Sequence, residues 1–208
     1  MIEKRSKGDV RLGCPEDVAS ADLPNILAAF TLEHPNVRLH VRCDLTLHLV
    51  EHFDAGAFDL VIIKQDPHRI ISGARSLREE RLAWAGPGSQ NGIAIDLCKK
   101  PVPLVLAPAP RVYRARAMEA IGSMGGDCDV VYASPSAAGQ IAAVRAGLGW
   151  TMLQRRRIPT DLTAVTDEGW PPLPPAIICL LVSTYSTGAV ETFARFVEMR
   201  FAHPHRQP

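Results

Sequence analysis

The sequence predicts an α/β protein made of two lobes that two crossing segments join. Strands and helices alternate over the first 65 residues, and a second strand–helix series starts at residue 102. A short strand and a proline-rich stretch separate the two series. We expect lobe I over 10–83 and 175–201 and lobe II over 84–174, with tails at 1–9 and 202–208.

Lobe I begins with a strand at Val10–Cys14, followed by a turn over 15–20. A helix over 22–33 is predicted because its apolar residues recur at core-facing spacing, and His34-Pro35-Asn36 ends it. The remaining elements are an alternating strand over 37–43, a short helix over 44–55 and a continuously apolar strand over 58–63. This order predicts a parallel sheet with right-handed crossovers.

Lobe II also shows alternating strand and helix patterns. The pattern predicts strands over 82–85, 102–106, 130–132, 150–153 and 162–165, and helices over 113–124 and 135–146. The segments 82–88 and 162–174 are expected to cross between the lobes. The chain closes with a strand over 177–182 and an amphipathic helix over 188–201, whose apolar positions are Val190, Phe193, Phe196 and Val197.

The stretch VVYASPSAAGQIAAVRAGLGWTML, residues 130–153, reads as strand, serine-bearing turn, helix and strand. Ser134 is a good N-cap, and Pro135 suits the first helical position. Such a turn aims backbone N–H groups and two hydroxyls at one point, which suits a polar or anionic ligand. The alternative is that Ser134 and Ser136 only cap the helix, and the turn alone favours this alternative, because most N-cap serines contact no ligand.

Composition narrows the function classes. The chain has 23 Lys and Arg residues against 22 Asp and Glu, and it shows no basic stripe for nucleic acid. The N-terminus lacks the apolar stretch of a signal peptide, and no segment approaches membrane-spanning length, so we expect a cytoplasmic protein without membrane contact.

The five cysteines lack a C-x-x-C spacing and are expected to be reduced. Cys14 and Cys43 are expected at the ends of neighbouring strands, and Cys98 and Cys128 in one lobe; a redox pair is the less favoured alternative to simple packing.

Five segments, in this order, resemble the effector-binding domain of LysR-type transcriptional regulators. They are VRLGCPEDVASADLPNILAAFTLEHPNVRLHVRC, LHLVEHFDAGAFDLVII, REERLAWAGPGS, PLVLAPAPRVYRARAMEA and VVYASPSAAGQIAAVRAGLGWTML. Short pieces such as HPNV are unspecific, but the ordered series, which covers about residues 10–201, is fairly specific.

The resemblance implies two Rossmann-like lobes with a fold like type-2 periplasmic binding proteins and a small-molecule effector between them. It also implies a homo-oligomer, a dimer or a tetramer at full length, and an upstream winged helix–turn–helix domain. Only nine residues precede the first predicted strand, so DNA binding would require a domain outside this chain. A stand-alone solute-binding protein is the alternative function.

Carried over position by position, the resemblance places effector contacts at Asp17, Thr46, Pro108, Arg111, Tyr113, Ser134, Pro135 and Ser136. Glu16 and Asp17 make their turn acidic, where many relatives carry a serine or threonine in place of Asp17. Lys64, just past the third strand, is a candidate counter-charge, as is Arg111.

Three more specific functions, a zinc protease, a serine hydrolase and a phosphate-binding site, are less well supported by the sequence. His48-Leu49-Val50-Glu51-His52 spells the zinc-protease motif H-x-x-E-H, but Leu47, Val50 and Phe53 are expected to face the sheet and the histidines to face solvent. Ser134 and Ser136 lack the flanking glycines of a hydrolase elbow and a histidine base. Residues 155–157, three consecutive arginines, are expected to be solvated rather than to bind phosphate. We therefore predict no catalytic residues, no metal and no cofactor.

Overall fold

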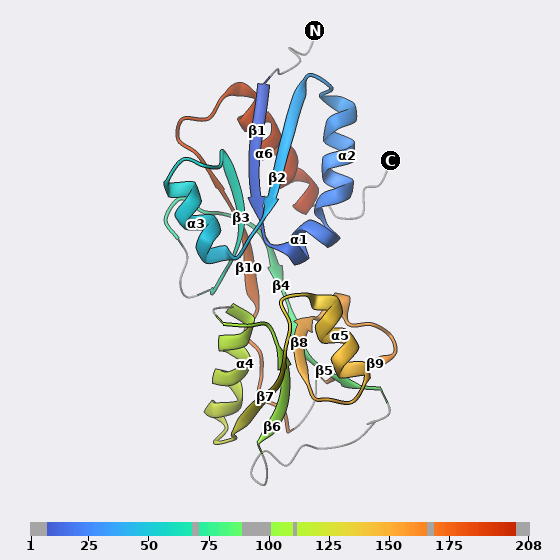
Figure 1. Cartoon of the computed structure of the whole chain (residues 1–208). Helices are drawn as coiled ribbons and strands as arrows, with labels where there is room; N and C mark the ends of the chain where they lie inside the picture. Colours follow the sequence, from blue (N-terminus) through green and yellow to red (C-terminus); the bar gives the residue numbers. More distant parts are fainter. Residues whose placement is uncertain (1–7, 68–70, 89–100, 110–111, 166–168, 203–208) are drawn as a thin grey trace. The chain divides into compact units, whose positions relative to one another are not determined.

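The computed structural model describes residues 8–67, 71–88, 101–109, 112–165 and 169–202. The chain divides into two compact units (Figure 1). Unit 1 comprises Met1–Glu79 and Ile177–Pro208, and unit 2 comprises Glu80–Ala176. The α/β class predicted from the sequence is confirmed in both units.

Unit 1 is built around a five-stranded sheet of order β2-β1-β3-β10-β4. Its elements are β1 (Gly8–Cys14), α1 (Glu16–Ala21), α2 (Leu23–Glu33), β2 (Val37–Cys43), α3 (Thr46–Asp54), β3 (Leu60–Gln65), β4 (Arg75–Glu80), β10 (Ala176–Val182) and α6 (Gly188–Ala202). Cys14 and Cys43 are register partners at the ends of β1 and β2, as the sequence predicted. Cys98 lies outside the described residues.

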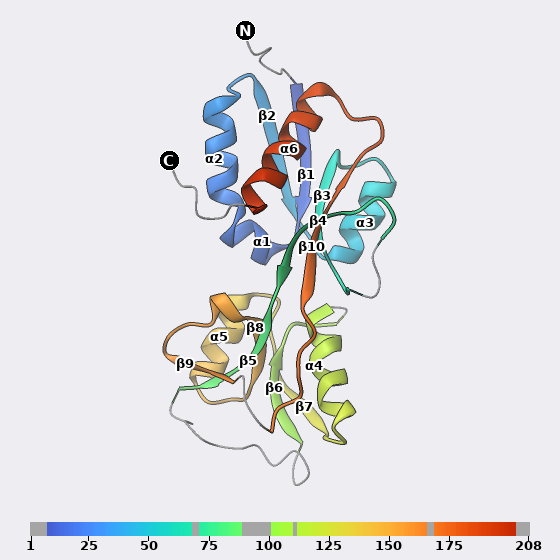
Figure 2. The same ribbon diagram turned by 180° about the vertical axis from the view of Figure 1, so that it is seen from behind.

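The parallel pairing predicted for the first three strands is confirmed, but the complete sheet of unit 1 is mixed. β1 pairs in parallel with β2 and β3, but β10 runs antiparallel to β3. The reason is connectivity: helical crossovers link β1, β2 and β3, whereas β10 starts where the chain re-enters unit 1. β4 lies next to β10 at the sheet edge (Figure 2).

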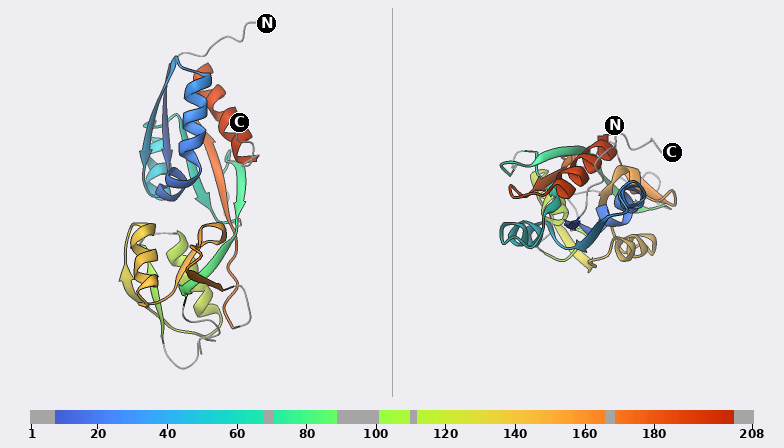
Figure 3. Two further views of the ribbon diagram at one scale, coloured as in Figure 1. Left: turned by 90° about the vertical axis from the view of Figure 1, so that its right-hand side faces the viewer. Right: turned by 90° about the horizontal axis from the view of Figure 1, so that it is seen from above.

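Helices cover both faces of this sheet (Figure 3). One core cluster joins β1 and β3 to α1, α2 and α6, with Phe30, Phe193 and Phe196 in edge-to-face contact at centroid distances of 4.8 and 5.3 Å. The second cluster packs Leu49 of α3 against the opposite face of β3 and β10. The four apolar positions predicted for α6 are all buried.

Two elements of unit 1 were not predicted. α1 occupies most of the expected turn over 15–20, and its single buried residue, Val18, gives no helical periodicity to detect. β4 has the sequence RSLREE, which is dominated by charge, and it is a strand because it pairs within the sheet. Neighbouring strands, rather than local propensity, decide such an element.

Unit 2 contains two smaller sheets of order β8-β5-β9 and β6-β7. Its elements are β5 (Leu82–Pro87), β6 (Val102–Leu106), α4 (Val112–Ser123), β7 (Cys128–Ala133), α5 (Ala137–Arg145), β8 (Thr151–Gln154), a 3₁₀ turn η1 (Arg155–Arg157) and β9 (Leu162–Val165). The two predicted crossing segments were wrongly assigned, because β5 and β9 pair with each other inside unit 2. The chain passes between the units at Glu79–Glu80 and Ala176–Ile177 instead.

Three tryptophans form the centre of the unit 2 core. Trp170 lies with its ring centroid 5.0 Å from Trp84 and 4.5 Å from Trp150. The Trp84 indole N–H donates to the carbonyl of Pro171 at 2.9 Å, so the buried polar atom is satisfied. A Cβ atom on Gly86 would lie 2.2 Å from the Trp150 ring, so only glycine lets β5 approach that ring.

Candidate functional site

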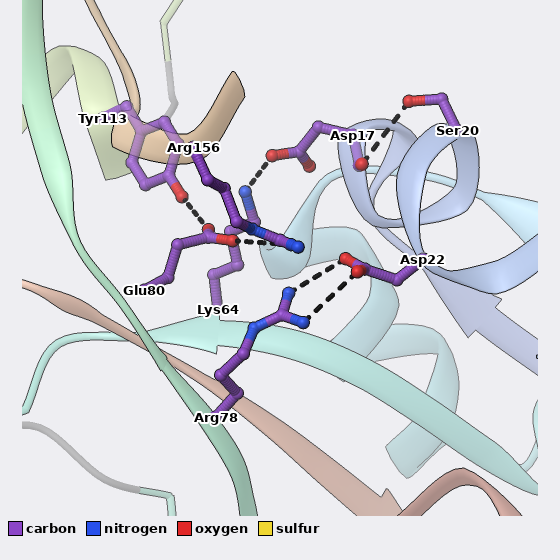
Figure 4. A network of polar contacts seen from close by, with 8 residues as sticks. All are labelled: Asp17, Ser20, Asp22, Lys64, Arg78, Glu80, Tyr113 and Arg156. Atoms are coloured by element: carbon purple, nitrogen blue, oxygen red, sulfur yellow. Dashed lines mark hydrogen bonds and ion pairs between the residues drawn. The ribbon is translucent and has the colours of Figure 1, made fainter. Parts of the chain in front are cut away.

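In unit 1 the candidate residues follow the carboxyl ends of parallel strands. Asp17 lies in the first turn of α1, directly after β1, and Lys64 is the penultimate residue of β3. The Lys64 ammonium group forms an ion pair with the Asp17 carboxylate (Figure 4), and only 7% of the Lys64 side chain is exposed. Lys64 is therefore the counter-charge of Asp17, one of the two acidic residues of this turn. Glu16 is exposed on the same turn.

A second pair anchors the same corner of unit 1. Arg78 of β4 donates two hydrogen bonds to Asp22, at 3.2 and 2.9 Å (Figure 4). Asp22 ends α1 and precedes α2, so the pair ties the α1–α2 corner to the sheet edge. Sequence reasoning missed both residues, because Arg78 belongs to the strand that it did not predict.

Thr46 is the half-buried first residue of α3. The preceding Asp44 accepts the backbone N–H of Leu45 at 2.8 Å, and His48 Nδ1 lies 3.0 Å from the same carboxylate oxygen. Burial acts to raise the pKa of Asp44, but the contacts with His48 and with the Leu45 N–H outweigh it and lower that pKa. A carboxylate thus stands beside Thr46 at neutral pH.

The two histidines of the H-x-x-E-H motif have separate partners. His48 contacts Asp44, whereas His52 Nδ1 lies 2.8 Å from an Arg42 guanidinium nitrogen. The expected facing of α3 was wrong at one position: Leu47 is 54% exposed and Leu49 is fully buried in its place. Val50 and Phe53 pack against the core and the two histidines are exposed, as predicted. Within the described ranges, no three His, Cys, Asp or Glu side chains are grouped to hold a metal ion.

In unit 2 the serine-bearing turn follows β7. The predicted N-cap at Ser134 and helical start at Pro135 were wrong: Ser136 is the N-cap and α5 begins at Ala137. The reason is local bonding, because Ser134 is still held by β6 through its N–H, which donates to the Leu106 carbonyl at 3.0 Å. Pro135 and Ser136 are exposed, and the Ser136 side chain makes no capping hydrogen bond.

The buried Ser134 hydroxyl shapes this turn from inside. It donates to the carbonyl of Ser136 and accepts the N–H of Ser136, both at 3.3 Å. Gln140 of α5 donates its side-chain amide to the Ser134 carbonyl at 2.9 Å and lies 3.4 Å from the Thr151 hydroxyl. A Cβ atom on Gly139 would lie 2.4 Å from Ser134 Oγ. The turn therefore rests on Gly139, Gln140 and Thr151, which sequence reasoning did not single out.

The remaining candidates of unit 2 are only partly brought together. Pro108 is exposed in the loop after β6, which is the parallel neighbour of β7, so this loop and the serine turn follow adjacent strand ends. Tyr113 of α4 donates its hydroxyl to Glu80 at 2.6 Å (Figure 4). Arg111 lies outside the described residues.

Glu80 is a buried carboxylate that contacts two elements of unit 2. Besides Tyr113, it faces a guanidinium nitrogen of Arg156 at 3.8 Å (Figure 4). Arg156 is thus an ion-pair partner and not a merely solvated arginine, which corrects the expectation for one member of the arginine run. The sequence signal that points to Glu80 is a carboxylate flanked by the apolar strand that starts at Leu82.

Known proteins share this architecture and part of this sequence. Residues 3–202 match the LysR substrate binding domain. The HTH-type transcriptional regulator DgdR of Burkholderia cepacia is 34% identical over 176 residues, which are 83% of this chain and 57% of that protein. This chain thus spans little more than half of that curated relative.

Solved structures agree with this match. The C-terminal domain of a probable LysR family transcriptional regulator from Rhodococcus sp. RHA1 is 25% identical, with a TM-score of 0.73, over 92% of this chain and 99% of that one. HinK, a LysR family transcriptional regulator from Pseudomonas aeruginosa, shares the fold with a TM-score of 0.74 at 22% identity, over 94% of this chain and 71% of that one. The present chain belongs to the LysR substrate-binding domain family.

Proposed function

We propose that this chain is the effector-sensing regulatory domain of a LysR-type transcriptional regulator, in which a separate domain binds DNA. The match of residues 3–202 to the family carries the proposal. The curated relative, at 34% identity, is an HTH-type regulator of greater length. The solute-binding alternative gains no support from these similarities.

The proposed effector contacts form two groups, one in each unit. In unit 1 they are Glu16, Asp17, Thr46 and Lys64, and in unit 2 they are Pro108, Arg111, Tyr113, Ser134, Pro135 and Ser136. The observation that favours the unit 2 group is the exposed Ser136 hydroxyl, which is not used to cap α5 although it stands at the helix N-terminus. A helix N-terminus with an available hydroxyl suits a polar or anionic group.

The two groups differ in what they offer a ligand. Ser134 supports the turn with its hydroxyl, so Ser136 is the serine that we assign to direct contact. In unit 1, Asp17 and Lys64 largely cancel each other's charge, so Thr46 is the residue whose hydroxyl we assign to the ligand. The effector is accordingly a small polar molecule that forms hydrogen bonds with these two hydroxyls.

A thermal-shift screen against a library of polar metabolites tests the proposal. A ligand that binds only the folded domain raises its melting temperature, with about 2.7 kcal/mol of added stability at a hundred times Kd. We expect at least one small carboxylate or polyol to do so in a saturable manner. A domain that is stabilised by no member of the library, yet binds specific DNA by itself, would contradict the assignment.

We also propose that the domain is non-enzymatic, acts in the cytoplasm and forms a homodimer with two-fold symmetry, the commonest arrangement of homo-oligomers. In the described part of the chain, no helix has the length and apolar character to cross a bilayer. Light scattering coupled to size-exclusion chromatography tests the dimer: twice the chain mass of 22.6 kDa is expected, and a monomer at high concentration would contradict it.

A further inference from the structure

Two cysteines stand side by side at the carboxyl ends of neighbouring parallel strands. Cys14 is the last residue of β1, Cys43 is the last residue of β2, and the two are register partners. Paired residues of a parallel ladder point to the same face, and neighbouring strands lie about 4.7–4.9 Å apart. Disulfides join Cα atoms about 4.4–6.8 Å apart, a range that includes this strand spacing, and the Cys14 and Cys43 thiols are in contact.

The two thiols differ in access. Cys43 is exposed at the sheet edge, whereas Cys14 is buried in the core cluster formed with α1, α2 and α6. Burial, and then the neighbouring Cys43 thiol, raise the pKa of Cys14, so Cys14 stays a thiol at neutral pH. An oxidant therefore meets Cys43 first.

The other described cysteines lack such a neighbour in register. Cys179 is buried in the cluster on the opposite face of the same sheet, and Cys128 is a half-buried residue of unit 2. They serve as internal controls, because their thiols share the chain and the solvent but not the strand-end pairing.

We propose that Cys14 and Cys43 form a reversible dithiol–disulfide pair that responds to hydroperoxides. The Cys43 thiolate attacks one peroxide oxygen of H₂O₂, the O–O bond breaks, and Cys43 becomes a sulfenic acid while the other oxygen leaves as hydroxide and is protonated to water. The Cys14 sulfur then attacks the Cys43 sulfur, its proton goes to the departing oxygen, and a second water leaves. Two thiols lose two electrons, and one peroxide gains them.

The position of the pair links it to the candidate site of unit 1. The N–H of Asp44 donates to the Cys14 carbonyl at 3.2 Å, and α1 and α3 begin within three residues of the two cysteines. A disulfide would brace the strand ends that carry Asp17 and Thr46. Formation of the bond does not depend on the proposed function, so it can be tested without an effector.

Peptide mapping tests the bond directly. Fully reduced protein is treated with one equivalent of H₂O₂, blocked with N-ethylmaleimide and digested with trypsin. Trypsin cuts after Arg11, Arg38, Arg42 and Lys64, so Cys14 and Cys43 fall in separate peptides, 12–38 and 43–64. We expect these two peptides to be recovered joined, with the loss of two hydrogens, and to separate after treatment with dithiothreitol. Recovery of both peptides blocked and unlinked, or of Cys43 joined to another cysteine, would overturn the proposal.

Substitutions separate the roles of the two thiols. Cys43→Ser, at an exposed position, should abolish the linked peptide, whereas Cys128→Ser should leave it unchanged. Cys14→Ala should leave Cys43 as a sulfenic acid that dimedone labels several-fold more than in the parent. Equal dimedone labelling of Cys43 in the parent and in Cys14→Ala would show that Cys14 does not react with the sulfenic acid, and would overturn the proposal. If Cys14→Ala folds poorly, the Cys43→Ser variant still tests whether the linked peptide requires Cys43.

Discussion

Lys64 and Asp17 form an ion pair between β3 and α1, with the Lys64 side chain almost entirely buried. The pair joins the ends of two parallel strands at the position where the sequence places candidate effector contacts. It also fixes α1, which has one buried apolar residue of its own. The ion pair therefore compensates the charge of Asp17 and positions the short helix that carries it.

Loss of Lys64 alone should destabilise unit 1, because it removes the buried cation that pairs with the Asp17 carboxylate. We expect Lys64→Met to lower the free energy of unfolding by about 3 kcal/mol, the lower end of the range for a broken buried pair. Urea denaturation measures the change. The double variant Lys64→Met with Asp17→Leu should recover most of the loss, and Arg38→Met, which breaks an exposed pair with Asp9, should change little. A Lys64→Met variant as stable as the parent would show that the pair contributes nothing.

Gly139 should resist replacement by alanine even though it lies in a helix. A Cβ atom there would press on the Ser134 hydroxyl, so we expect Gly139→Ala to lower the free energy of unfolding by about 1–3 kcal/mol. Gly122→Ala in α4 is the matched control: nothing lies within 4 Å of its Cβ position, and it should gain up to about 1 kcal/mol. Thermal unfolding of the two variants gives the signs, and a stabilising Gly139→Ala would contradict the packing described for the serine turn.

Asp59 should contribute stability that depends on pH. Hydrogen bonds from the Arg11 side chain, opposed by burial and assisted by the Arg11 N–H, lower the pKa of Asp59 below its usual value. A carboxylate with a lowered pKa stabilises the fold above its unfolded pKa of about 3.9, and the contribution is lost as pH falls through the folded value. Because the Arg11 side chain is half exposed, we expect less than about 1 kcal/mol.

The measurement is the difference in unfolding free energy between the parent and Asp59→Asn from pH 7 to pH 3. The difference should be constant down to about pH 5 and shrink below pH 4. A difference that does not vary with pH would mean that the Asp59 carboxylate is not linked to folding.

Local periodicity was enough to predict the elements whose burial is strong. β2, β6 and β9 have the predicted bounds, and α6 buries the four apolar positions that its spacing indicated. The neighbouring ends of β1 and β2 followed from the order of the elements, as did the Lys64 counter-charge to Asp17. These features depend on residues close in sequence or on the general rules of parallel sheets.

What the sequence did not predict depends on distant partners. β4 is a strand by virtue of its place in the sheet, and the antiparallel direction of β10 follows from the path through unit 2. α5 starts at Ala137 because the Ser134 N–H is hydrogen-bonded to the Leu106 carbonyl of β6. Local rules for N-caps do not include such a contact with another strand. Glu80 is a buried hydrogen-bond acceptor because the Tyr113 hydroxyl, 33 residues away in the sequence, donates to it. Tertiary pairing overrides propensity in each of these cases.

Calorimetric titration of the stabilising ligand into the serine and threonine variants tests the central claim, that this domain senses an effector through its strand-end turns. Ser136→Ala and Thr46→Ala should each raise Kd about two- to twelve-fold, which corresponds to about 0.5–1.5 kcal/mol for one lost hydrogen bond, without loss of stability. Ser134→Ala should mainly lower stability, because its hydroxyl supports the turn. If Ser136→Ala and Thr46→Ala both bind the ligand as tightly as the parent, the effector does not contact these turns and the account of the site is wrong.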